Sequence, residues 1–230
     1  MHRNDIRIAA REGGEFDCYV VEPDMTDPVP AVVLASAVHG VDADIRQIAD
    51  ELASQGFFAA APDLFWRTTP GPLPRTDKRT AARSEPRRQT IATGEADLAD
   101  TLDALRRRPG CNGRAVVMGF CYGGPYAIIG PKRLGFEAGI ACHGSSMLDF
   151  IADTTDLTRP VCLVWGDRDN RAPVDVLDAY RALCARSDNV EIHVFPGVQH
   201  GFMMQHDERF DAEARQFAMR RTVALLDALR

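Results

Sequence analysis

The chain has 230 residues, of which 45% are hydrophobic and 26% charged, and its formal net charge at pH 7 is −6. This length is enough for one well-buried core and short for two, so we expect a single domain over residues 1–230. The acidic balance argues against proteins that bind nucleic acid or acidic membranes, which usually carry a basic surface.

The first ten residues are polar and lack the apolar run of a signal peptide. No stretch of 18 apolar residues occurs in the sequence, so we expect no membrane-spanning helix. The six cysteines include no C-x-x-C pair, which favours reduced thiols over a disulfide framework. We therefore expect a cytoplasmic protein, a monomer or a homodimer, whose partner is a small molecule.

Short apolar runs alternate with longer amphipathic segments along the chain. The runs predict buried or half-buried strands at residues 31–35, 57–61, 115–118, 161–165 and 190–195. Helical patterns lie at residues 44–55, 95–108, 173–186 and 211–229. This alternation predicts an α/β fold with a mostly parallel central sheet and helices on both faces. In such sheets the functional groups collect on loops that leave the carboxyl ends of the strands.

One stretch interrupts this alternation. Residues 67–88 are rich in proline, arginine and threonine, which predicts a long loop or a cap. Its basic part carries six positive side chains: Arg75, Lys78, Arg79, Arg83, Arg87 and Arg88. These cations form either a solvated face or a cap that captures anions, and the solvated face is the commoner explanation of such a run.

The sequence G-F-C-Y-G-G at residues 119–124 directly follows the third predicted strand. It matches the G-x-nucleophile-x-G turn in which a strand reverses into a helix, with Cys121 as the nucleophile. Such a turn strains the backbone at the nucleophile, so glycine is needed on either side. A helix N-terminus and a nearby imidazole would both favour the reactive thiolate. The alternative is a glycine-rich turn that holds a buried cysteine without chemistry.

Two later loops supply candidate partners for Cys121. On sheets of this kind the order along the chain is nucleophile, acid and histidine. Asp169 follows the fourth predicted strand and is the expected acid, whereas Asp167, beside a glycine, is expected to form the turn. His200 follows the last predicted strand and would take the proton from the thiol.

The oxyanion of the intermediate would be bound by backbone N–H groups. Tyr122, directly after the nucleophile, supplies one, and we expect Val38, in the loop after the first predicted strand, to supply the other. His39 and His143 each precede a glycine at a strand end, so both are candidates for lining the site. The histidines show no convincing metal-ligand spacing, and we expect no metal.

With these motifs the chain resembles the dienelactone hydrolase family over nearly its whole length. The resemblance rests on the cysteine turn at 119–124, on Pro-Asp-Leu-Phe at residues 62–65, on Gly166 with Asp169, and on His200 before a Gly-Phe pair. It implies an α/β-hydrolase fold and the hydrolysis of an ester or lactone through a thioester on the cysteine. It also implies that no cofactor takes part.

Two departures from the family bear on the substrate. The glutamate that members typically carry in the oxyanion loop corresponds to Ala37, and one of the arginines that hold a substrate carboxylate corresponds to Met203 or Met204. We therefore expect a more apolar or neutral ester. The candidates for substrate binding are His39, Arg79, Arg83, Phe202 and Met204, with Met203 and Trp66 as further pocket lining. The apolar members of this set serve equally well as core residues.

Two other classes of function stay open. A non-catalytic member of the fold would bind a small molecule or a partner protein, and the loss of the oxyanion-loop glutamate favours it. A thiol redox protein is a weaker alternative, because no resolving cysteine lies near Cys121 in the sequence. The joint presence of Cys121, Asp169 and His200 favours the hydrolase, since a binding protein needs no triad.

Overall fold

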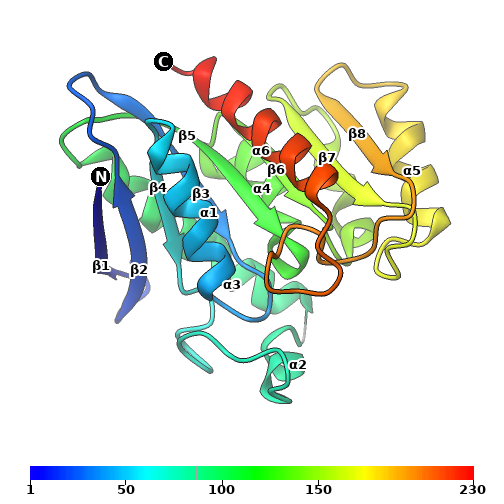
Figure 1. Ribbon diagram of the computed structural model, residues 1–230, viewed down its shortest axis with the longest axis horizontal. Helices are drawn as coiled ribbons and strands as arrows, with labels where there is room; N and C mark the ends of the chain where they lie inside the picture. Colours follow the sequence, from blue (N-terminus) through cyan, green and yellow to red (C-terminus); the bar gives the residue numbers. More distant parts are fainter. Residues whose placement is uncertain (86) are drawn as a thin grey trace.

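The computed structural model describes residues 1–85 and 87–230, which form one central sheet with helices on both sides (Figure 1). Residue 86 and the side chains of Arg87 and Arg88, all within the predicted loop or cap at 67–88, lie outside the described part. The strands are β1 (His2–Ala9), β2 (Glu15–Glu22), β3 (Val29–Ala35), β4 (Phe58–Pro62), β5 (Cys111–Phe120), β6 (Ala138–Cys142), β7 (Val161–Gly166) and β8 (Val190–Phe195).

The order of the strands across the sheet is β1-β2-β4-β3-β5-β6-β7-β8. From β4 to β8 the neighbouring strands run parallel, whereas β1 and β2 pair antiparallel and β2 joins β4 antiparallel. The predicted α/β fold with a mostly parallel sheet is therefore confirmed. Because the carboxyl ends of parallel strands reach the same edge, the loops after β3, β5, β6, β7 and β8 meet there.

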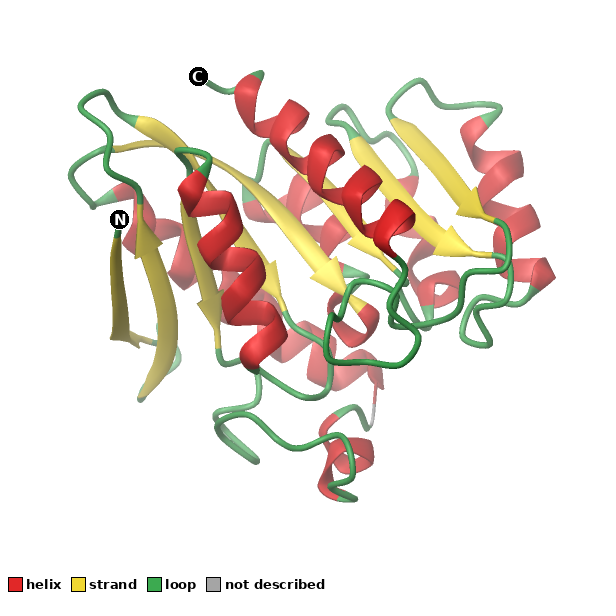
Figure 2. Cartoon of the chain, in the orientation of Figure 1, coloured by secondary structure: helices red, strands yellow, loops and turns green. Residues whose placement is uncertain are grey.

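The helices are α1 (Ala43–Ser54), α2 (Arg79–Arg83), α3 (Arg87–Arg106), α4 (Tyr126–Ile129), α5 (Val174–Cys184) and α6 (Ala212–Asp227), with short turns η1 (Cys121–Gly123), η2 (Gly130–Leu134) and η3 (Met147–Thr154). In Figures 1 and 2, α1 and α6 cross in front of the sheet, and α3 and α4 lie behind it. Asp42 and Asp211 begin α1 and α6, because each carboxylate accepts a hydrogen bond from a first-turn N–H. None of the described helices has the length and apolar character needed to cross a bilayer.

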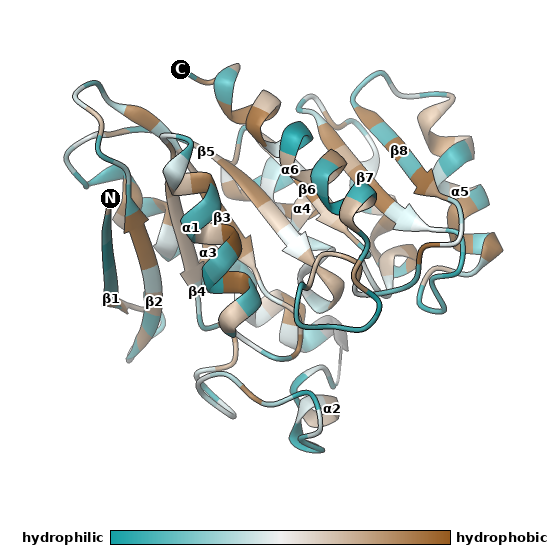
Figure 3. Cartoon of the chain, viewed as in Figure 1, coloured by the Kyte–Doolittle hydropathy of each residue, from teal (hydrophilic) through white to brown (hydrophobic). Residues whose placement is uncertain are grey.

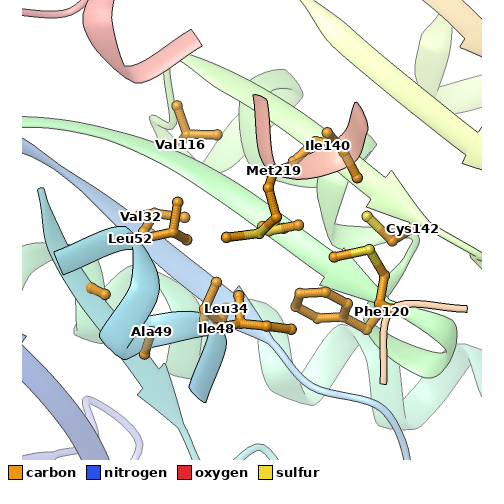
Figure 4. Close-up of a cluster of buried hydrophobic side chains, with 14 of the residues drawn as sticks. Val32, Leu34, Ile48, Ala49, Leu52, Val116, Phe120, Ile140, Cys142 and Met219 are labelled. Atoms are coloured by element: carbon orange, nitrogen blue, oxygen red, sulfur yellow. The ribbon is translucent and has the colours of Figure 1, made fainter. Parts of the chain in front are cut away.

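Each face of the sheet carries its own hydrophobic layer, because alternate residues of a strand point to opposite sides. On β3, Val32 and Leu34 face α1 and α6, whereas Val33 faces α3. Figure 4 shows the first layer, where Leu52 of α1 and Met219 of α6 lie over the strands. Packing on both faces makes the sheet a rigid base for the loops at its carboxyl edge.

Three observed strands, β1, β2 and β6, are absent from the sequence-based prediction. The edge strand β1 is mostly exposed and hydrophilic (Figure 3), so its sequence contains no apolar run. Strand β6 is short and rich in small residues because α4 packs closely on it. A Cβ on Gly139 would lie 1.8 Å from the carbonyl oxygen of Ala127. Because close packing requires small side chains here, the segment lacks the run of large apolar residues that predicts a strand.

The segment 67–88 is not the unbroken loop that its composition suggests. Its described part contains the short helix α2, and α3 begins at Arg87, eight residues before the predicted helix start at residue 95. In Figure 1, α2 lies beyond the carboxyl edge of the sheet. The segment is thus placed beside the edge where the functional loops meet.

Candidate active site

The candidate nucleophile Cys121 lies at the sharp turn where β5 ends and η1 begins. Its φ of 48° is in the left-handed region, which residues other than glycine rarely adopt. A Cβ on Gly119 would lie 2.2 Å from the Gly123 carbonyl oxygen, and one on Gly123 would lie 2.1 Å from the Ala35 carbonyl oxygen. The sequence folds into this strained turn because only glycine fits at both flanking positions.

Asp169 and His200 come together from the loops after β7 and β8. The Nδ1 atom of His200 lies 2.9 Å from both carboxylate oxygens of Asp169. The Asp169 side chain is fully buried, and its Oδ1 also accepts the Arg171 backbone N–H at 2.8 Å. A carboxylate fixed in this way holds the imidazole by Nδ1, which leaves Nε2 for a partner on the other side.

The environment of His200 suits a base that acts on a thiol. Burial lowers the pKa of His200, but the hydrogen bonds with Asp169 and with Cys121 outweigh burial and raise that pKa to about 9. Cys121 and His200 also line the same pocket. The three residues singled out from the sequence therefore meet at one point of the structure.

Asp167 has a different position from Asp169. Its Oδ1 accepts the backbone N–H of Gly197 at 2.7 Å, which ties the loop after β7 to the loop that carries His200. This carboxylate therefore shapes the turn, as expected from its place beside a glycine.

The two expected oxyanion donors lie in segments that are held from outside the pocket. The loop of Val38 is anchored by Arg83, which donates to the Val38 carbonyl oxygen at 3.0 Å. The side chain of Tyr122 is buried against Phe65, with the ring centroids 5.0 Å apart. Both backbone segments are thus fixed before any substrate binds, as an oxyanion site requires.

Cys121 and His200 open into a pocket of about 720 Å³, a volume suited to a small molecule. One wall consists of the loops at the carboxyl edge of the sheet. The facing wall, which we call the cap wall, consists of Thr80, Ala81, Ser84 and Glu85, in α2 and just beyond it. The remaining lining comes from the start of η3 and the start of α5.

Only some of the residues predicted to bind substrate reach this pocket. His39 lines it. Phe202 and Met204, together with Met203, are buried in the hydrophobic layer under α6, so the expected apolar lining is corrected: these side chains fill the core. Trp66 packs on Phe16 at the other side of the sheet.

The two candidate arginines of the cap also bind groups of the chain itself. Arg79 is exposed and pairs with Asp77 at 2.7 Å. Arg83 is 2% exposed, and its guanidinium donates to the carbonyl oxygens of Val38, Thr69 and Gly71. Neither lines the pocket among the described residues, so the expectation that they hold substrate is replaced by a structural role for Arg83.

The pocket contains two cations that sequence reasoning missed, Arg171 and Arg209. Arg209 donates to Asp207 at 2.6 Å, and Asp207 also pairs with Arg75 at 3.0 Å. Arg75 in turn pairs with the buried Asp44 at 2.8 Å. This chain of ion pairs joins α1, the segment before α2 and the loop after β8. No local spacing in the sequence signals it, because its members come from three separate segments.

His143, expected from the sequence to line the site, is buried behind His200 and is not among the described residues that line the pocket. Its ring centroid lies 4.9 Å from that of His200 and 5.1 Å from that of Phe202. Neither ring nitrogen has a hydrogen-bond partner. Burial, and then the charge of His200, lowers the pKa of His143 well below its ordinary value. His143 is therefore a neutral imidazole whose ring packs against that of His200.

One group among the described residues has the composition of a metal site. The ligand atoms of Cys162, Glu191 and His193 lie within 4.8 Å of one another. Cys162 and Glu191 stand near the beginnings of β7 and β8, at the edge of the sheet opposite to Cys121. Glu191 already forms an ion pair with Arg221, which neutralises its charge. We therefore assign this cluster no part in the chemistry of the pocket.

Known proteins resemble this chain over nearly its whole length. Residues 16–229 match the model of the dienelactone hydrolase family. Carboxymethylenebutenolidase 1 of Cupriavidus pinatubonensis is 29% identical over 233 residues, covering 100% of this chain and 99% of the relative. The carboxymethylenebutenolidase of Pseudomonas putida is 24% identical over 232 residues, covering 100% of this chain and 98% of the relative.

The fold has relatives among solved structures as well. A protein of Klebsiella pneumoniae named for the same family has a TM-score of 0.84 at 23% identity, and the match covers 98% of each chain. The family match spans the strands from β2 onward except Glu15, together with the cysteine turn and the loops of Asp169 and His200. The chain belongs to the dienelactone hydrolase family.

Proposed function

We propose that this protein hydrolyses a small ester or lactone with Cys121 as nucleophile, His200 as proton carrier and Asp169 as the residue that orients the histidine. Membership of the dienelactone hydrolase family makes the protein an ester or lactone hydrolase, and the assignment of residues is ours. The observation that carries the assignment is a shared pocket. Cys121, at the strained turn, and His200, which is held by Asp169, line the same cavity.

In the first step His200 takes the thiol proton, and the thiolate attacks the carbonyl carbon of the substrate. The resulting imidazolium is stabilised by the buried carboxylate of Asp169. The backbone N–H groups of Val38 and Tyr122 donate to the oxyanion. When the intermediate collapses, the imidazolium protonates the departing alkoxide, and a thioester remains on Cys121.

In the second step neutral His200 takes a proton from water, and the hydroxide attacks the thioester carbon. The C–S bond breaks, the sulfur recovers its proton from the imidazolium, and a carboxylic acid leaves. For a lactone the alcohol stays attached to the acyl group, so the product is one hydroxy acid. Water is the only co-reactant, and the sequence of steps needs no cofactor.

The charges in the pocket change the expected substrate. The missing arginine after His200 in the sequence predicts a more apolar or neutral ester, but Arg171 and Arg209 line the pocket. Carboxylates line it too, at Glu85, Asp149 and Asp175. Desolvating these groups against an apolar substrate would cost free energy. We therefore propose a small polar ester or lactone.

The wider setting of the enzyme is part of the same proposal. We take residues 1–230 as one domain that acts on a small molecule in the cytoplasm. The buried thiols of Cys18, Cys142 and Cys162 are unpaired with one another, which suits a reducing compartment.

The test is hydrolysis of p-nitrophenyl acetate by the wild type and by Cys121→Ala, with intact-protein mass recorded during turnover. We expect an acetyl adduct that forms and decays on the wild type only. Cys184→Ala, which removes a half-buried thiol at the end of α5, is the matched control and should behave as the wild type. Equal rates and no adduct in any of the three would contradict the cysteine nucleophile and favour a binding protein.

A further inference from the structure

The loop after β6 brings a hydroxyl group to the nucleophile. The Oγ atom of Ser145 lies 3.8 Å from the Sγ atom of Cys121, a hydrogen-bond contact in which either atom can donate. The backbone N–H of Ser145 also donates to the Cys121 carbonyl oxygen at 3.0 Å. Ser145 is 8% exposed and lines the pocket. It is therefore a nearly buried polar residue in contact with the sulfur that reacts.

The fold holds this loop in an uncommon backbone conformation. His143 and Ser146, on either side of the contact, have φ values of 43° and 55°, in the left-handed region. The Gly144 carbonyl oxygen accepts the indole N–H of Trp165 at 3.0 Å. A Cβ on Gly124 would lie 2.5 Å from the Gly144 Cα, so the loop packs directly on the cysteine turn. Packing of this kind sets the position of the hydroxyl, and such strain is typical of functional sites.

We propose that Ser145 is a further catalytic residue, whose hydroxyl donates a hydrogen bond to the Cys121 thiolate and stabilises it for attack. This inference rests on the cysteine chemistry proposed above. The thiol proton passes to His200 as before, and Ser145 keeps its own proton, so no additional reactant is needed. The thiolate then has two donors, the imidazolium and the hydroxyl. A hydrogen bond to an ionised acceptor is stronger than one between neutral groups.

The contact has a specific consequence for the pH dependence of Cys121. A donor to the thiolate lowers the pKa of the thiol, because it stabilises the charged form more than the neutral thiol. Removal of one such hydrogen bond should raise that pKa by about one unit, which is about tenfold less thiolate at a given pH below it. A residue that only shaped the loop would change folding or KM without moving this pH profile.

The test is the pH dependence of Cys121 alkylation by iodoacetamide, resolved by peptide mass, for the wild type, Ser145→Ala, Ser145→Val and Ser145→Thr. Valine and threonine have nearly the same shape, so that pair differs mainly in the hydroxyl. We expect the midpoint of alkylation to rise by about one pH unit in the alanine and valine variants, with kcat/KM about tenfold lower. The threonine variant should keep a midpoint close to that of the wild type.

Ser54→Ala, at the exposed end of α1, is the control and should leave both quantities unchanged. An unchanged midpoint in Ser145→Ala, or equal shifts in the valine and threonine variants, would overturn the role of Ser145. If the wild type itself forms no acyl adduct and Cys121 reacts with the pH profile of an ordinary thiol, the cysteine chemistry fails instead. The two failures are therefore distinguishable.

Discussion

The two walls of the pocket are built in different ways. One is formed by the loops at the carboxyl edge of the sheet that carry the proposed triad, which we call the catalytic wall, and the other is the cap wall. Cys121 and His200 stand on loops that the sheet positions through backbone contacts, tight glycine packing and the buried Asp169. The cap wall around α2 is held by guanidinium groups, with Arg83 on three carbonyl oxygens and Arg75 between two buried aspartates. The residues of the proposed triad are thus positioned by the rigid sheet, whereas the cap wall is positioned by side-chain contacts. Substitutions in the first wall should remove turnover, and those in the second should weaken it.

The largest effect should come from the catalytic wall. In His200→Ala no group remains to take the thiol proton, so we expect kcat/KM to fall by on the order of 10³ or more. Stopped-flow measurement of the acylation step gives the value, and circular dichroism checks the fold. His2→Ala is the matched control and should leave kcat/KM unchanged, because the His2 side chain on β1 is 78% exposed. A loss of less than tenfold in His200→Ala would count against the triad.

The next effect separates the two aspartates after β7. Asp169→Asn should reduce kcat by about 10²–10⁴, because an amide no longer fixes the imidazole in the required tautomer or balances its charge. Asp167→Asn should stay within about tenfold of the wild type, since its amide oxygen can still accept the Gly197 N–H. Steady-state kinetics of both variants decide the matter. The opposite ranking would transfer the acid role to Asp167.

The two walls also differ in how far the sequence predicts them. The cysteine turn is local: the predicted strand, the glycines and the nucleophile all lie within residues 115–124, so their spacing determines the conformation. Asp169 and His200 follow predicted strands, and a parallel sheet brings such loops to one edge. The α/β fold and the candidate triad were therefore predictable although β1, β2 and β6 were not.

The cap wall and the cations of the pocket were not predictable, because they depend on contacts between distant segments. After His200 the chain turns inward, and Phe202, Met203 and Met204 enter the core. Only further turns bring Arg209 back to the pocket, so spacing from the histidine is misleading. The basic run around Arg83 predicts a solvated surface cation, yet its guanidinium donates to carbonyl groups at three separate positions of the chain.

Arg83 links the two walls through the Val38 carbonyl oxygen, and its removal should have an intermediate effect. Arg83→Met leaves three carbonyl groups without their donor, which costs about 1–3 kcal/mol for a buried group. We expect a lower midpoint of thermal unfolding and about a tenfold loss of kcat/KM, mostly through KM. Arg79→Met, at an exposed position that pairs only with Asp77 among the described residues, is the control. Equal behaviour of the two variants would show that the cap wall does not depend on Arg83.

The smallest effect is a difference between the pH profile of kcat and that of kcat/KM, both measured on the wild type. The pKa of His200 is raised to about 9, against burial, by its contacts with Asp169 and Cys121. Acylation removes the charge that Cys121 can carry, so the pKa of His200 should fall below 9 in the thioester. Deacylation needs neutral imidazole, and kcat limited by it should rise with pH through this lower value.

Acylation by an alkyl ester needs the imidazolium to protonate the leaving group, so kcat/KM should fall as pH rises through about 9. The two limbs therefore run in opposite directions and leave a range near neutral pH in which both steps proceed. Profiles of kcat and kcat/KM with the same alkyl ester measure them. A kcat limb that rises only at pH 9 or above would mean that Cys121 does not set the proton affinity of His200. In that case Asp169, and not Cys121, would be the group that raises the pKa of His200.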